Sequence, residues 1–444
     1  MILESIQTKD LACLALIAIP AFLVLKTFLT YLLDPLDLRK YPAPSFLAAT
    51  TQFWVLKETW LQRRSRSIHA QHKKLGNVIR IAPSLVVFNI PEAVPDIYGH
   101  AAARKLIKDT FYDKIAGHER DIVNVVDHGD HAQRKKYLSN SFALKTVTDM
   151  EPVIRENFQR LLNHIDTVVL GPDKTSSGAT FDIRRWHVIS CPIRLKPWLM
   201  NRRLDSGVPE RPQSDFMSKI LADRDGKERM IPFQQLMAES VVFMNAGSET
   251  TAAALSSTLY YLISNPKCLD KLRAEVDTRL SSGHNGIVPY DAVKDLPYLR
   301  ACIDEALRLR PPIAYALQRL VVSPEGATIA GHHVKQGTTV AVSPWTIHRN
   351  ESLYKNPDEF DPERWFDPDQ LANLRKHYIV FSQGPRQCLG RHIAIVELQI
   401  LISTLTRRYN MALADEKKEL EIYDRFNSNP GPLPIKVERR VFVE

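Results

Sequence analysis

The sequence lacks the cysteine pattern of a disulfide-stapled or zinc-ribbon protein. Its five cysteines are scattered over 444 residues, and no two of them form a CxxC pair. An odd, widely spaced set in a chain of this length argues against a disulfide framework, and the missing CxxC pair excludes a thioredoxin-like motif. We therefore expect the bulk of the protein to face a reducing compartment.

Several nucleotide-binding and hydrolase signatures are also absent. The sequence contains no GxGxxG run, no Walker-type loop, no GxSxG elbow and no internal repeat. Lys and Arg total 59 against 50 Asp and Glu, a net charge of +9, but no dense basic tract is interleaved with aromatic residues. We therefore expect no nucleic-acid partner, and we expect the basic surface to meet an anionic membrane or an acidic protein.

A long apolar run lies near the N-terminus, from Leu11 to Leu33, and is interrupted chiefly by Pro20 and Lys26. About 20 apolar residues suffice to cross a bilayer. Little positive charge precedes the run, whereas basic residues follow it, so its C-terminal side should be cytosolic. We predict an uncleaved, single-pass transmembrane helix with a hinge over residues 1–40; a cleaved signal peptide and a buried core helix are the alternatives.

The rest of the chain is typical of a mainly α fold with small β-sheets. Apolar periodicity predicts long helices over residues 234–266 and 298–312 and from about 391 to 408, and alternation predicts strands over 327–345. This order does not alternate strand and helix regularly, which argues against a doubly wound fold. We predict that residues 41–444 form the catalytic domain.

Cys388 has an unusual context in "FSQGPRQCLG". Gly384, Pro385 and Gly390 shape a tight loop around it, and Arg386 adds positive charge. Loop N–H groups, the cation and the N-terminus of the following helix all favour a thiolate. A lone cysteine is most often a small buried apolar residue. A thiolate would be a nucleophile or a metal ligand, and the sequence shows no base for the first role, whereas an axial ligand of haem iron needs only space for the ring.

The same stretch resembles the haem-binding loop of cytochrome P-450 monooxygenases, with Phe381, Gly384, Arg386, Cys388 and Gly390 in register. The resemblance spans the chain after the hinge and points to fungal microsomal members, such as benzoate 4-monooxygenase-like enzymes and secondary-metabolite hydroxylases. It implies haem b with Cys388 as axial thiolate, and electrons from NADPH through a cytochrome reductase. It also implies the endoplasmic reticulum membrane, with the catalytic domain on the cytosolic side.

Two further motifs follow the order of that family. "EALR" supplies Glu305 and Arg308, whose i, i+3 spacing places them on one helix face, and "FDPERW" supplies Arg364. By resemblance the three form a buried charge network around the haem pocket, although taken alone the first two would be an ordinary surface pair.

"AGSETT" places polar residues inside the long apolar helix. In the resembling family this helix crosses the haem, Gly247 leaves room for dioxygen, and Thr250 with Glu249 delivers protons as an acid–alcohol pair. Exposure on the helix surface is the alternative explanation of these polar residues.

The resemblance also implies contacts to the cofactor and substrate. His131 and Lys135 in "HGDHAQRKKYL", together with Arg349 and Arg386, are the candidate partners of the haem propionates. A solvated basic face is the alternative for the segment that contains Lys135. Further haem contacts are expected at Phe381, Gly390 and Ala246, and pocket walls at Phe111, Tyr112, Ala246, residues 313–317 and Phe426.

Two features depart from the family. His131 and Gly247 lie 116 positions apart, fewer than is typical, so we expect part of the distal lid helices to be missing around residues 186–215. A real deletion and a misread splice site would both explain this. Gln318 stands where the family usually has a proline.

These observations predict a membrane-anchored haem-thiolate monooxygenase that inserts one atom of O2 into a small hydrophobic substrate, in fungal secondary metabolism. One alternative is a haem-thiolate isomerase or dehydratase, against which the acid–alcohol pair argues. The other is a truncated, inactive haem-binding protein, which the shortened lid favours.

Overall fold

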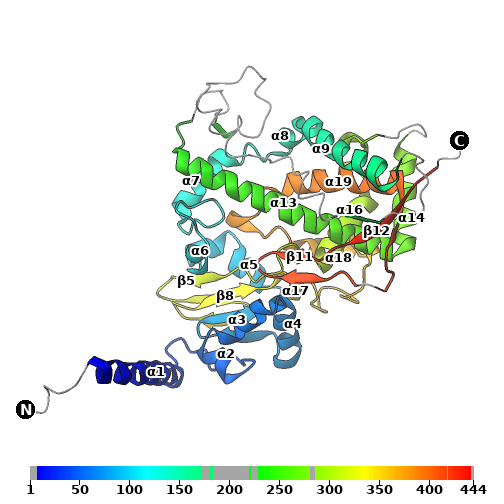
Figure 1. Ribbon diagram of the computed structural model, residues 1–444. Coiled ribbons are helices and arrows are strands. Elements are labelled where there is room, and N and C mark those ends of the chain that lie inside the picture. Colours follow the sequence, from blue (N-terminus) through cyan, green and yellow to red (C-terminus); the bar gives the residue numbers. More distant parts are fainter. Residues whose placement is uncertain are drawn as a thin grey trace, which may run out of the picture.

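The structure is a computed structural model, and its described residues are 8–171, 180–183, 220–221, 229–280, 286–417 and 419–441. Within these ranges a helical part lies beside four small sheets (Figure 1). The predicted architecture, mainly α with small β-sheets, is confirmed. The shortened region predicted around residues 186–215 lies outside the described residues.

The α-helices of the described residues are α1 (Thr8–Leu33), α2 (Phe46–Thr50), α3 (Phe53–Trp60), α4 (Arg64–Leu75), α5 (Ala93–Tyr98), α6 (Phe111–Lys114), α7 (His128–Leu138), α8 (Leu144–Asp149), α9 (Glu151–His164), α13 (Phe233–Ser264), α14 (Pro266–Arg279), α15 (Tyr290–Val293), α16 (Pro297–Leu309), α17 (Pro344–Ile347), α18 (Pro368–His377) and α19 (Arg391–Arg408). Shorter helical turns are η1 (Ala101–Arg104), the π-helical η2 (Ile165–Val169), η3 (Pro362–Phe366) and η4 (Gly384–Arg386). The strands are β1 (Val78–Ala82), β2 (Leu85–Phe88), β3 (Leu106–Lys108), β4 (Thr180–Asp182), β5 (Arg319–Val321), β6 (Ala327–Ile329), β7 (His332–Val334), β8 (Thr339–Val342), β9 (Tyr409–Leu413), β10 (Ile422–Asp424), β11 (Ser428–Pro430) and β12 (Pro434–Arg439).

The largest sheet has the strand order β1-β2-β8-β5-β3, in which β2 and β8 are parallel and the other pairs antiparallel. A second sheet has the order β4-β12-β9, and β6–β7 and β10–β11 are separate two-stranded hairpins. The strands predicted within residues 327–345 are observed as β6, β7 and β8.

The three long helices predicted from the sequence are observed as α13, α16 and α19, and α13 runs across the helical part of the molecule (Figure 1). Its second half is buried on every side from Thr251 to Leu259. An apolar helix without a polar face must lie inside a core. The first half of α13 instead faces a cavity, so one helix serves as both core and cavity wall.

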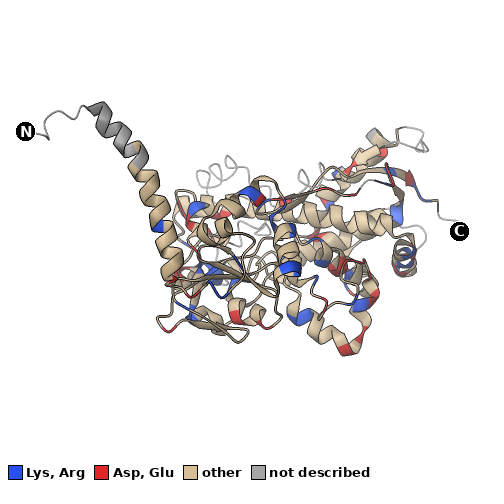
Figure 2. Ribbon diagram, turned by 90° about the horizontal axis from the view of Figure 1, so that it is seen from below, with Lys and Arg blue, Asp and Glu red and all other residues tan. Residues whose placement is uncertain are grey.

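Helix α1 stands out from the body of the molecule (Figure 2). Its apolar side chains, including Phe22, Val24 and Leu33, are exposed. Among the described residues, none of the helices combines the length and the apolar character needed to cross a membrane. The predicted transmembrane helix is therefore not supported by this part of the chain.

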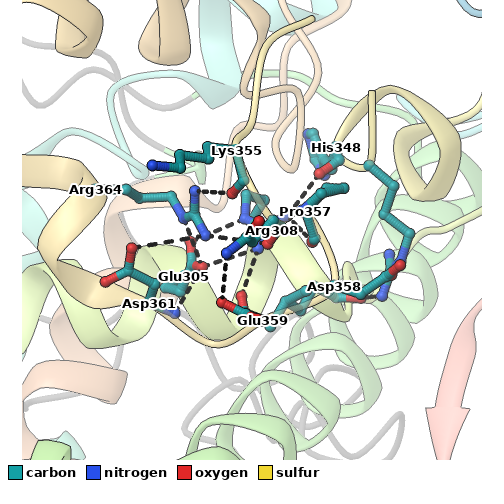
Figure 3. Close-up of polar contacts among 12 residues, drawn as sticks. Glu305, Arg308, His348, Lys355, Pro357, Asp358, Glu359, Asp361 and Arg364 are labelled. Atoms are coloured by element: carbon teal, nitrogen blue, oxygen red, sulfur yellow. Dashed lines mark hydrogen bonds and ion pairs between the residues drawn. The ribbon is translucent and has the colours of Figure 1, made fainter. Parts of the chain in front are cut away.

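A buried carboxylate joins α16 to the segment that follows the large sheet. Glu305 Oε1 accepts hydrogen bonds from Arg308 Nη2 at 2.9 Å and from Arg364 Nε at 2.8 Å (Figure 3). Glu305 Oε2 accepts from Arg308 Nε at 2.9 Å and from the indole of Trp365 at 3.1 Å. The structure thus brings together the three residues that the sequence motifs supply.

Arg308 extends this network to the backbone of distant segments. Its guanidinium donates to the carbonyl oxygens of His348, Pro357 and Glu359 at 2.6 to 3.0 Å. The His348 ring in turn accepts the N–H of Ile379 at 3.0 Å, and Ile379 lines the cavity. Through these contacts the charge network fixes the segment that leads into the Cys388 loop.

We predict that Glu305→Gln lowers the free energy of unfolding by about 3–5 kcal/mol, because the substitution leaves two buried guanidinium groups without their carboxylate. Chemical denaturation of the purified protein would measure the loss. The matched control is Glu363→Gln, which breaks an exposed pair with Lys271 at 2.6 Å and should cost less than about 1 kcal/mol. Equal losses in the two variants would contradict a central role for the buried network.

Candidate haem site

A cavity of about 900 Å³ separates the first half of α13 from the Cys388 loop. The α13 wall includes Ala246, Gly247, Thr250 and Thr251. The opposite wall includes Phe381, Arg386, Cys388 and Gly390. Two sequence motifs that lie more than a hundred residues apart therefore face each other across one space.

The loop is closed by local backbone contacts and by one close approach. The N–H of Cys388 donates to the carbonyl of Phe381 at 2.9 Å. Gly384 has φ +70°, and a Cβ atom at this position would lie 2.1 Å from the carbonyl oxygen of Tyr98. Both the left-handed backbone and the contact with α5 therefore require glycine at position 384.

The side chain of Cys388 is exposed because it opens into the cavity, while protein surrounds it on the other sides. Burial raises the pKa of the thiol, and the N–H groups of Gly390 and Arg391 and the charge of Arg391 lower it without cancelling that rise. The predicted N–H donors are thus present, but they do not by themselves produce a thiolate. A bound metal cation would, because a coordinating thiol is deprotonated outright.

Arg386 does not contribute to the thiolate as the sequence suggested. Its guanidinium points away from the sulfur and donates to the carbonyls of Val125 and Val126 at 2.7 and 2.8 Å. Burial lowers the pKa of Arg386 to about 10, and the neighbouring charge of Arg319 adds to this effect. Among the described residues its Nε is buried without a hydrogen-bond partner, so a donor remains available.

Basic side chains gather in the lining of the cavity. Lys108, His131, Arg319 and Arg386 all line it. Burial lowers the pKa of Lys108 far below its ordinary value, with further contributions from Arg386 and Arg319, while Asp121 opposes the shift. Burial, followed by the charges of Arg386 and Lys108, lowers the pKa of His131 to about 3, so this ring is the neutral member of the group at physiological pH.

This cluster fits the two carboxylates of a haem. An anion between the buried cations would reduce the repulsion between them and would accept a hydrogen bond from Arg386 Nε. A thiol that needs a metal to ionise lies on the same cavity. The residues present therefore suit a group that carries a metal ion and peripheral negative charge.

Two predicted propionate partners lie outside this cluster. Lys135 donates to the carbonyl of Pro385 at 2.9 Å. Arg349 pairs with Asp358 at 2.8 Å, donates to the carbonyl of Leu309 and stacks on Trp345. Neither Lys135 nor Arg349 lines the cavity, because each side chain binds another part of the fold.

Sequence reasoning missed Lys108 and Arg319. Both lie on the large sheet, where Lys108 in β3 pairs with Arg319 in β5. Pairing of strands more than 200 residues apart brings the two cations together, and no local motif reveals it. The only sequence signal is Arg319 itself, directly after the unusual Gln318.

The proposed acid–alcohol pair does not share one orientation. Thr250 lines the cavity, and its hydroxyl donates to the carbonyl of Ala246 one helical turn earlier. Glu249 does not line the cavity; its carboxylate accepts hydrogen bonds from Asn427 and Asn429. Adjacent residues of an α-helix point about 100° apart, because 3.6 residues complete a turn.

The predicted pocket walls are placed in two layers. Tyr112, Ile313, Leu317 and Phe426 line the cavity. Phe111 lies behind them, stacked on Phe426 with ring centroids 6.1 Å apart. These four residues therefore give the cavity an aromatic and apolar part of its lining.

Comparisons with known proteins agree with this geometry. A family model described as Cytochrome P450 matches residues 198–438, more than half of the chain. The monooxygenase cicH of Emericella nidulans is 26% identical, over 91% of this chain and 94% of its own length. The benzoate 4-monooxygenase bphA of Aspergillus niger is 26% identical over 95% and 96%, and the trichothecene C-15 hydroxylase of Fusarium sporotrichioides 25% over 81% and 85%.

We predict that Cys388→Ala abolishes the Soret band of thiolate-ligated haem in the reduced carbon monoxide complex, because the variant has lost the only cysteine among the described residues that line the cavity. The difference spectrum of the reconstituted protein would measure this. Cys268→Ala, at a partly exposed cysteine away from the cavity, should keep the band. A thiolate band in Cys388→Ala would contradict the assignment.

We also predict that Gly384→Ala prevents haem incorporation, because its Cβ would collide with the Tyr98 carbonyl. Gly331→Ala is the matched control: Gly331 has a similar φ of +80° but no atom within 4 Å of the added carbon, so it should lose only about 1 kcal/mol of stability. Haem content per protein and thermal unfolding distinguish the two. Similar haem loading in both variants would show that the close approach is dispensable.

Proposed function

Because the chain belongs to the cytochrome P450 family and its named relatives are monooxygenases and hydroxylases, we propose that it inserts one atom of O2 into a small hydrophobic substrate in fungal secondary metabolism. Membership identifies the chain as a cytochrome P450 monooxygenase that uses haem iron, a cysteine thiolate and a redox partner. One observation carries the assignment: Cys388 opens into a 900 Å³ cavity directly across from the Thr250 wall of α13.

The cofactor that we propose is haem b, which supplies the activation of dioxygen when bound. Cys388 would hold its iron, while Arg386, Arg319 and Lys108 would hold its carboxylates. Thr250 would hold a proton at its Oγ1, on the side of the cavity that faces Cys388. NADPH would provide electrons through a cytochrome reductase, which an excess of basic surface residues would attract.

The substrate should be apolar and compact. Phe243, Phe426, Ile313 and Leu317 give the cavity an apolar lining in addition to its basic residues. Such walls select by shape and apolar contact, with few polar groups to orient the ligand. Two relatives are named benzoate 4-monooxygenase and trichothecene C-15 hydroxylase. Both names are compatible with a substrate that has a small carbon skeleton.

We propose the endoplasmic reticulum membrane as the location, with the catalytic domain on the cytosolic side. Exposed apolar side chains of α1, such as Phe22 and Leu33, support a lipid-facing role for residues 1–40. Leu38 and Tyr41 are buried, so the packed body begins close to the proposed boundary at residue 41.

A truncated, inactive haem-binding protein is the second candidate. The alignment with cicH has 476 positions but covers 91% of this chain, about 404 residues, so roughly 72 positions are gaps in this chain. A shorter chain with an open cavity would admit water and release reduced oxygen instead of product. The outward orientation of Glu249 likewise favours a haem-thiolate isomerase or dehydratase as the alternative chemistry.

Turnover with NADPH and a reductase separates these functions. We predict that Thr250→Ala lowers product formed per NADPH by about 100-fold, the lower range of general acid catalysis, while hydrogen peroxide release rises. Ser248→Ala is the matched control, since its hydroxyl makes the same bond to a carbonyl one turn earlier but does not line the cavity. Unchanged coupling in Thr250→Ala would contradict the proton role.

Haem without a thiolate band would indicate the inactive protein, and conversion of a peroxide without NADPH would indicate the isomerase.

A further inference from the structure

The hairpin β10–β11 brings a cavity wall to α13. Its turn carries Phe426 and Asn427, both of which line the cavity. Asn427 Nδ2 donates to Glu249 Oε2 at 3.1 Å, and Asn429 Nδ2 donates to the same oxygen at 3.0 Å. Asn427 lies at the end of the turn and Asn429 lies in β11, so the turn and the strand share one acceptor on α13.

The two residues that flank the turn of this hairpin, Asp424 and Ser428, have partners elsewhere. Asp424 is buried and accepts from both the N–H and the hydroxyl of Ser65 on α4. The N–H of Ser428 donates to the carbonyl of Pro312 at 2.7 Å. These contacts fix the strand ends on either side of the turn, whereas Glu249 links the turn to the helix that carries Thr250.

A single two-stranded hairpin has little stability of its own. The position of Phe426 therefore depends on these contacts and on two aromatic rings, Phe111 at 6.1 Å and Tyr315 at 5.7 Å between ring centroids. If the Glu249 contact were absent, the side of the turn toward α13 would lose its two side-chain anchors. Phe426 could then move away from the cavity.

We propose that Glu249 is a positioning residue that holds Phe426 and Asn427 against α13 and thereby limits the size of substrate accepted beside Thr250. This role rests on the proposed monooxygenase function and deepens it, since it assigns a specificity determinant to the same cavity. The assignment rests on the direction of the carboxylate, which meets the hairpin and does not itself line the cavity.

Both asparagines donate to one oxygen, which makes a sharp substitution available. Glu249→Gln keeps a single acceptor oxygen in place but removes the titratable proton. Glu249→Ala removes the acceptor. If Glu249 positions the hairpin, the Gln variant should keep the hairpin in place and the Ala variant should not. If Glu249 donates a proton, both variants should lose that function.

The first measurement is hydrogen exchange of the backbone amides in residues 422–430 of the full chain. We expect Glu249→Ala to speed this exchange by roughly ten-fold, the size of one hydrogen bond to a charged group, and Glu249→Gln to stay within about two-fold of the parent. Asn427→Ala combined with Asn429→Ala should reproduce the Glu249→Ala effect, and adding Glu249→Ala to that pair should change nothing further.

The second measurement compares two haem-coordinating probes, imidazole and a bulky biaryl-substituted imidazole, by Soret shifts. In Glu249→Ala the Kd of the bulky probe should fall about ten-fold relative to that of imidazole, because Phe426 no longer limits the cavity. Glu249→Gln should keep the parental ratio.

Unchanged exchange and an unchanged probe ratio in Glu249→Ala would overturn the positioning role, as would equal defects in the Gln and Ala variants. Failure of the monooxygenase function is recognised separately, because a parent protein without thiolate-ligated haem fails only the probe measurement. Hydrogen exchange requires no haem and still decides whether Glu249 holds the hairpin.

Discussion

The buried carboxylate of Glu305 is the contact on which the site depends. It is fully enclosed, with Arg308 equally buried beside it, and such charges are tolerable only when every oxygen and N–H is paired. Here the pairing partners come from α16, η3 and the backbone of residues 348–359. Satisfying one charge therefore forces three distant segments into a single arrangement, and the segment that leads to Cys388 is attached to it through His348 and Ile379.

The cavity that this framework supports is lined by buried basic side chains whose charges burial disfavours. Lys108, Arg319 and Arg386 line it, and burial disfavours the charge of Lys108 and Arg386. On the same cavity a thiol has its pKa raised although two N–H groups are directed at it. Burial therefore disfavours both the charged basic groups and the thiolate, which are the forms that would bind a cofactor. A single group with a metal ion and two carboxylates would stabilise all of these charges. Haem binding should thus stabilise the fold as well as enable the chemistry.

Much of this could be predicted from sequence because the relevant signals are local. The apolar periods of α13, α16 and α19 extend over many residues, and the glycines around Cys388 mark a turn because glycine adopts a left-handed backbone readily. The cation cluster could not be predicted in the same way. Lys108 and Arg319 come together only because their strands pair. Lys135 instead donates to a backbone carbonyl, and Arg349 pairs with Asp358. A basic residue carries no local mark of which partner the fold will bring to it.

Glu249 illustrates the same limit within a single motif. Its neighbours Thr250 and Thr251 line the cavity, whereas the Glu249 carboxylate meets the hairpin. The asparagines that it meets lie almost 180 residues later in the chain. A carboxylate beside the Thr250 hydroxyl thus becomes a hydrogen-bond acceptor for another part of the fold. The chemistry assigned to an acid in a motif depends on which side of the helix holds the substrate and which side holds the rest of the fold.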